Sequence, residues 1–197
     1  MSAVSASAWL YLASTGLAAP ADPQLPIEPA AASAQTLRID AAGTAVDFDI
    51  AALWILRRSG RFSAIDGTLD INATGDQAQI RVRIAVDSVN MKDPDHVSLL
   101  LSPAFFDASR YPLIEFNSEP FALAGQSQLK LPGVLTVRGI SRKVLFNLDL
   151  GQCRPGPPAA CKVIVDGVLH RSQFGMTEYR RTLAEQVHLR ISAVVAR

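Results

Sequence analysis

Alternation of apolar and polar residues, repeated in several short runs, most constrains what this chain can fold into. Residues 80–87 read Ile-Arg-Val-Arg-Ile-Ala-Val-Asp, so an extended chain would place the isoleucines and valines on one face and the charges on the other. The runs 46–50, 144–150 and 187–193 alternate in the same way. A helix could not bring these sets to a single side. The sequence therefore predicts an all-β domain whose strands have one apolar and one solvated face.

Glycine-containing turns separate these runs, as at Thr74-Gly75-Asp76 and Arg138-Gly139, and we also expect turns or bulges at Asp66-Gly67 and Pro132-Gly133. Residues 95–101 lack strand alternation and predict a short helix, with Asp95 as its N-cap. The expected strands lie near 36–40, 44–52, 61–72, 78–89, 112–123, 128–138, 140–151, 162–171 and 185–196. We expect an antiparallel up-and-down β-barrel of about eight strands with the helix near one end, a size that can hold one small ligand. Two packed sheets with a filled centre are the alternative.

The first 35 residues differ in character from the body of the chain. Residues 1–21 contain a short apolar core, Ala8–Ala13, and an Ala19-Pro20-Ala21 end, which together predict a signal peptide, although no basic residue precedes the core. The apolar run is too short to span a bilayer, and an inert leader is the alternative. Residues 22–35 are rich in proline and alanine and predict a linker, which leaves 36–197 as the barrel domain. We expect a periplasmic or secreted protein.

Two cysteines, Cys153 and Cys161, flank a loop of seven residues that contains three prolines. In an exported protein an even number of cysteines predicts a disulfide that closes this loop. The two residues would remain free thiols if the protein stayed in the cytosol.

Reactive side chains do not gather into a known catalytic pattern. The histidines His96, His170 and His188 are widely separated, without the spacing of a metal site. Asp47 and Asp49 share a strand face that should be solvated, and the sequence has neither a serine-hydrolase elbow nor a glycine-rich phosphate loop. The formal net charge of +1 gives no reason to expect a nucleic acid partner. We therefore expect neither an enzyme nor a metal or cofactor, and a homodimer is compatible with the sequence.

Two longer motifs suggest a family. Leu99–Phe116 contains Leu-x-Ser-x-x-Phe-Phe-Asp followed by Tyr-Pro-x-Ile-x-Phe, and Gly133–Phe146 begins Gly-Val-Leu-Thr-Val-Arg-Gly-Ile-Ser-Arg. Together they resemble the YceI-like family, and the resemblance extends over about residues 37–195. It implies a lipocalin-like barrel that holds a long isoprenoid-type lipid. The chain departs from the family pattern at Ala52, where many relatives have histidine, and at His96-Val97, where Arg-Asp is common.

The resemblance and the strand polarity together predict an apolar ligand site, formed by side chains that face the barrel interior or its mouth. The interior residues are Phe48, Ile50, Phe62, Ile84, Val86, Ile114, Phe116, Leu135, Phe146 and Leu148, and those nearer the mouth are Phe105, Phe106, Phe174 and Met176. The helix and the loop after it could gate this mouth or plug it. The expected function is non-catalytic binding of an isoprenoid or quinone-type lipid. The rival is a barrel with a filled core that acts as an envelope protein-interaction or stress-response module.

Overall fold

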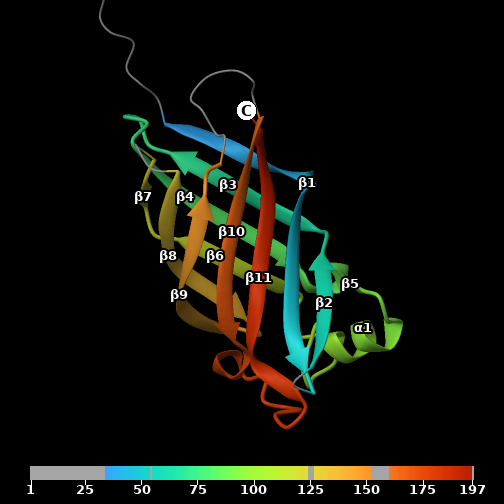
Figure 1. Cartoon of the computed structure of the whole chain (residues 1–197). Helices are drawn as coiled ribbons and strands as arrows, with labels where there is room; N and C mark the ends of the chain where they lie inside the picture. Colours follow the sequence, from blue (N-terminus) through green and yellow to red (C-terminus); the bar gives the residue numbers. More distant parts are fainter. Residues whose placement is uncertain (1–33, 54, 124–126, 152–159, 197) are drawn as a thin grey trace, which may run out of the picture. The chain divides into compact units, whose positions relative to one another are not determined.

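The computed structural model describes residues 34–53, 55–123, 127–151 and 160–196 (Figure 1). The predicted signal peptide, most of the linker, Cys153 and the side chain of Cys161 lie outside the described residues. The elements in chain order are β1 (Gln35–Ala52), β2 (Leu56–Phe62), β3 (Ile65–Ile71), β4 (Gln77–Ala85), the 3-10 helix η1 (Val86–Ser88), β5 (Val89–Met91), α1 (Pro94–Leu101), β6 (Leu113–Ser118), β7 (Phe121–Ala122), β8 (Gln128–Val137), β9 (Ile140–Asp149), β10 (Ala160–His170), the 3-10 helix η2 (Arg171–Phe174) and β11 (Leu183–Ala196).

Eight strands close into an antiparallel barrel in the order β1-β3-β4-β6-β8-β9-β10-β11, and β11 pairs back onto β1. Strand β1 is long enough to pair with two further strands besides β11. Its first part pairs with β3, where Gln35 lies opposite Ile71, and its second part pairs with β2, where Val46 lies opposite Phe62. The small strands β5 and β7 pair with β2 and β4. The predicted up-and-down barrel with one short helix is confirmed, and the alternative of two packed sheets is wrong.

The barrel wall follows the predicted alternation. On β4 the side chain of Ile84 is buried, while Arg81 and Arg83 point outward. Their guanidinium groups reach Asp70 and Asp66 on the neighbouring strand β3, at 3.2 and 3.0 Å. Apolar side chains therefore fill the inner face, and the outer face carries cross-strand ion pairs.

Several predicted boundaries are wrong. The two expected strands at 36–40 and 44–52 form one strand, β1, with a register shift between Asp40 and Ala45 against β11. The expected strand 61–72 is divided between β2 and β3. Asp66-Gly67 and Pro132-Gly133 lie inside β3 and β8 rather than in turns. At Gly67 the reason is close approach, because a β-carbon there would lie 2.8 Å from the carbonyl oxygen of Arg81.

The N-cap of the short helix lies two residues earlier than predicted. Asp93 rather than Asp95 is the N-cap of α1, since its carboxylate accepts a hydrogen bond from the Asp95 amide at 3.0 Å, and Pro94 occupies the first turn. At the other end of α1 the chain folds back. The Phe106 amide donates to the carbonyl of Leu100 at 2.9 Å. This hydrogen bond holds the loop after α1 against the C-terminal end of the helix.

Candidate ligand-binding cavity

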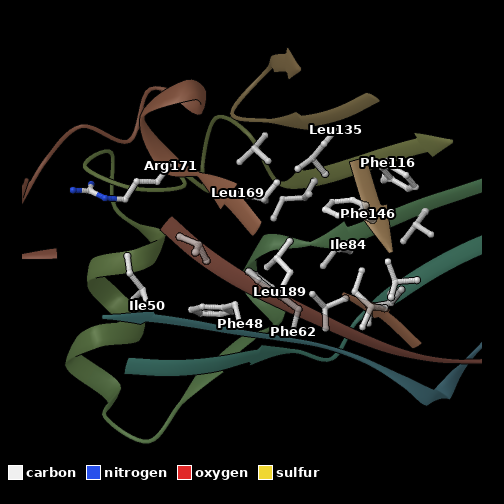
Figure 2. A pocket seen from close by; sticks show the side chains of 18 of the residues that line it. Phe48, Ile50, Phe62, Ile84, Phe116, Leu135, Phe146, Leu169, Arg171 and Leu189 are labelled. Carbon is white, nitrogen blue, oxygen red and sulfur yellow. The ribbon is translucent and has the colours of Figure 1, made fainter. Parts of the chain in front are cut away.

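A cavity of about 420 Å³ lies inside the barrel. Each of the eight barrel strands contributes to its wall, and nearly all of the lining side chains are aliphatic or aromatic. Figure 2 shows side chains such as Phe48, Ile84 and Leu189 projecting from different strands toward the same space. The volume falls within the range of about 300–1,000 Å³ that small-molecule sites usually have.

The structure places thirteen of the fourteen predicted site residues on this wall. They are Phe48, Ile50, Phe62, Ile84, Phe105, Phe106, Ile114, Phe116, Leu135, Phe146, Leu148, Phe174 and Met176. Val86 is buried but does not line the cavity. Strand β4 ends at Ala85, and the chain then turns into η1, where the Val86 amide donates to the carbonyl of Pro112 at 2.9 Å. That the thirteen residues contact a ligand stays a prediction.

Sequence reasoning missed the wall formed by β10 and β11. Val163 and Val165 of β10 line the cavity, as do Leu189 and Ile191 of β11. The alternation of 187–193 was visible in the sequence and could have identified the β11 residues. Which strands face each other across the lumen depends on the closing β1–β11 pairing, which the pattern of one strand does not reveal.

Three glycines leave room for aromatic rings along the inner wall. A β-carbon at Gly60 would lie 2.3 Å from the Phe48 ring, and one at Gly167 would lie 2.1 Å from the Phe146 ring. A β-carbon at Gly133 would lie 2.6 Å from the Phe116 ring. Because glycine has no side chain, each ring can pack directly against the backbone of the barrel wall. The glycines therefore let the barrel carry large apolar side chains and still enclose a cavity.

Arg171, a buried cation in the lining, holds one end of the barrel together. Its guanidinium group donates to the carbonyl oxygens of Met176, Glu178 and Ala184 at 2.8, 2.6 and 2.9 Å. Burial lowers the pKa of Arg171, and nearby Glu185 acts in the opposite direction. Since these hydrogen bonds hold the segment after η2 and the start of β11, we assign this arginine a structural role. Figure 2 shows it at one end of the labelled group, away from Phe116.

Apart from Thr44, which lies beside Val194, the other polar side chains of the lining concentrate at that same end of the barrel. Arg58, His96, Tyr179 and Thr182 all line the cavity there. His96 Nδ1 lies 3.3 Å from a carboxylate oxygen of Asp93. The end is formed by the turn between β1 and β2, by α1 with its loop, and by the segment from η2 to β11 (Figure 1). We call this end the mouth. Sequence reasoning did not place these polar residues at the site.

Among the described residues, no group of three or more His, Cys, Asp or Glu side chains could hold a metal ion. None of the helices resolved there is long and apolar enough to cross a bilayer.

Comparison with known proteins identifies the barrel. The family model of the YceI-like domain matches residues 37–195. This chain belongs to the YceI-like family. Among its relatives, a UPF0312 protein of Staphylococcus aureus (strain USA300) is 26% identical over 142 residues, which cover 70% of this chain and 80% of the relative. A UPF0312 protein of Vibrio cholerae (El Tor strain N16961) is 27% identical over 124 residues, covering 61% and 66% of the two chains.

Solved structures share the YceI-like fold. BcnA of Burkholderia cenocepacia superposes with a TM-score of 0.69 at 22% identity, covering 79% of this chain and 98% of BcnA. A YCEI protein of Campylobacter jejuni gives a TM-score of 0.63 at 22% identity, covering 70% and 84%. A polyisoprenoid binding domain from Saccharophagus degradans gives 0.62 at 14% identity, covering 81% and 97%. At these identities the comparisons establish the barrel fold.

One departure from the family pattern lies at the mouth of this YceI-like barrel. Ala52, where the resemblance led us to expect a departure from the family pattern, lines the cavity with only a methyl group. His96 lies in the lining at the same end. Any polar contact with a ligand at the mouth must therefore come from groups other than residue 52.

Proposed function

We propose that this protein binds one long apolar lipid, of isoprenoid or quinone type, inside the barrel without changing it chemically. The observation that carries the proposal is the cavity of about 420 Å³ with an almost wholly apolar wall. Transfer of apolar surface from water to such a site contributes about 25 cal/mol per Å². The barrel-fold relative named as a polyisoprenoid binding domain supports the same ligand class. The cavity favours this function over a barrel with a filled core.

The polar residues at the mouth suggest how the lipid is oriented. Tyr179 and Arg58 can offer a hydroxyl and a guanidinium group to an oxygen-bearing head. The deeper wall is apolar except for Thr44, whose hydroxyl accepts a hydrogen bond from the Val194 amide at 3.2 Å. His96 is the third polar group there, although it lies near Asp93. The tail therefore occupies the barrel, and the quinone ring or alcohol end lies at the mouth.

Lipid extraction tests the proposal directly. The full-length protein, purified without detergent from a host that makes isoprenoids, is extracted with organic solvent, and the extract is analysed by mass spectrometry. We expect one prenyl lipid or quinone at close to one molecule per protein. Phe116→Asp protein purified in parallel is the matched control and should yield far less. An extract free of apolar lipid, together with no binding of added decyl-ubiquinone, would reject the proposal.

Export is a second part of the proposal. The segment 1–21 is the proposed signal peptide, and the mature chain then begins near Asp22. Intact-mass measurement on protein from the periplasm or medium of the native host tests this. A mass that retains Met1 or its immediate neighbours would contradict it.

A further inference from the structure

Large apolar side chains are exposed together at the mouth. Around the turn between β1 and β2, Leu53, Ile55 and Leu56 are 53%, 88% and 44% exposed, and Tyr179 of the segment before β11 is 49% exposed. We call these four residues the rim. The other exposed large apolar residues of the described chain lie on β6, β8, β9 and β10 of the outer wall. Large apolar side chains that are exposed together on the surface of a domain usually mark a site that binds something.

The two parts of the rim are held together by the backbone. The Leu53 amide donates to the carbonyl of Thr182 at 2.7 Å, and the neighbouring Ala52 pairs with Leu183 of β11. The Tyr179 ring stacks on Phe105, with ring centroids 5.7 Å apart. The exposed turn and the exposed tyrosine thus form one surface.

This surface is continuous with the cavity. Leu53 and Tyr179 line the cavity, yet about half of each side chain is exposed. Both residues also have a left-handed backbone, with φ of 49° and 58°. That conformation is uncommon for bulky residues and is often found at functional sites. An apolar chain entering or leaving the barrel here would stay in contact with apolar side chains.

Arginines flank the rim on both sides. Arg57 and Arg58 follow the turn, and Arg180 and Arg181 follow Tyr179, all of them exposed. Arg57 forms an ion pair with Asp49 at 2.9 Å. Within the described residues, no carboxylate lies within ion-pair distance of the other three. The two segments that carry the rim contain these four arginines and the exposed Glu178, so their charge is net positive, which suits an anionic surface.

We propose that the rim docks on an anionic lipid bilayer. The apolar side chains enter the boundary between headgroups and acyl chains, and the flanking arginines contact lipid phosphates, as at other interfacial anchors. A lipid tail could then pass between bilayer and cavity without crossing water. The docking follows from the rim itself, and only this transfer step rests on the proposed function.

Vesicle binding tests the docking. The mature chain, which after the proposed cleavage lacks Trp9, has Trp54 as its only tryptophan, and Trp54 lies between Leu53 and Ile55 in the sequence. It is mixed with vesicles of phosphatidylcholine containing phosphatidylglycerol, and bound protein is measured by flotation and by tryptophan emission. We expect binding with a blue shift, and at least tenfold weaker binding to pure phosphatidylcholine.

Matched variants locate the contact. Ile55→Asp should lower the affinity for vesicles at least tenfold, while Leu145→Asp, at an outer-wall residue that is 59% exposed, should leave it unchanged. Changing Arg180 and Arg181 together to glutamine should weaken binding to anionic vesicles and reduce its salt dependence. Equal affinity of the Ile55→Asp and Leu145→Asp proteins, or equal binding to both vesicle types, would overturn the proposal.

Quinone binding separates this inference from the proposed function. Ile55→Asp should bind decyl-ubiquinone added in solution as well as the parent does, because the side chain lies outside the cavity lining. Phe116→Asp should dock on vesicles normally and lose the quinone. Docking by a protein that binds no quinone would reject the proposed function alone, and quinone binding without docking would reject the inference alone.

Discussion

Replacing Phe116 with aspartate distinguishes a lipid cavity from a filled core. Phe116 lies on β6 with 8% of its surface exposed, and its ring centroid is 5.3 Å from that of Phe146. The ring also lines the cavity. An aspartate at this position would project toward the place where we expect a lipid tail.

The magnitude follows from the apolar contact that is lost. A carboxylate recruits water or stays protonated with a raised pKa, because an unpaired charge is costly to bury. If it displaces one isoprene unit of five carbons, at about 0.8 kcal/mol for each carbon, binding weakens by about 4 kcal/mol. That loss corresponds to roughly a thousandfold increase in Kd. The fold should survive because the cavity beside Phe116 can admit water.

The assay compares decyl-ubiquinone titration with urea unfolding for each variant. Phe116→Leu is the matched control that keeps an apolar group, and it should bind within about tenfold of the parent, since the change is smaller. Leu145→Asp introduces the same charge on the outer wall and should alter neither property. Quinone binding at parental affinity by folded Phe116→Asp protein would refute the assignment of this face to the ligand. Unfolding of Phe116→Asp without any quinone binding by the parent would instead indicate a filled core.

Three further predictions concern the framework of the site. Arg171→Met should lower the free energy of unfolding in urea by about 2 kcal/mol, because it leaves buried carbonyl oxygens without donors. Cys153 and Cys161 should form a disulfide in exported protein, so the denatured, unreduced chain should take up no thiol label; two labelled thiols would contradict this. Burial acts to raise the pKa of Glu185, but hydrogen bonds from Ser172 and nearby positive charges lower it overall. Its contribution to stability should therefore be present at neutral pH and decline below about pH 4, as the lowered pKa is approached, and Glu185→Gln should remove that part of the pH profile.

Much of the barrel could be predicted from the sequence because a strand with one buried face records its orientation in alternate residues. The run 80–87 identified Ile84 as inward-facing and Arg83 as outward-facing, and both assignments agree with the structure. The short helix could be recognised because the alternation stops there. Its cap was wrong by two residues, since Asp93 and Asp95 both lie shortly before the apolar residues that begin at Val97 and the choice depends on the backbone at Pro94.

The sequence by itself determined which faces are apolar, and hence most of the cavity lining. Only the tertiary structure decided which strands enclose the lumen, because the closing pair of β1 with β11 joins residues as far apart as Arg38 and Ala196. It also decided that the lumen is hollow, since the close fit of Gly167 against Phe146 arises between neighbouring strands. Alternation is a local property of the chain, whereas closure and empty volume depend on contacts between distant residues. The mouth, where Leu53 meets the chain before β11, is therefore a product of tertiary structure.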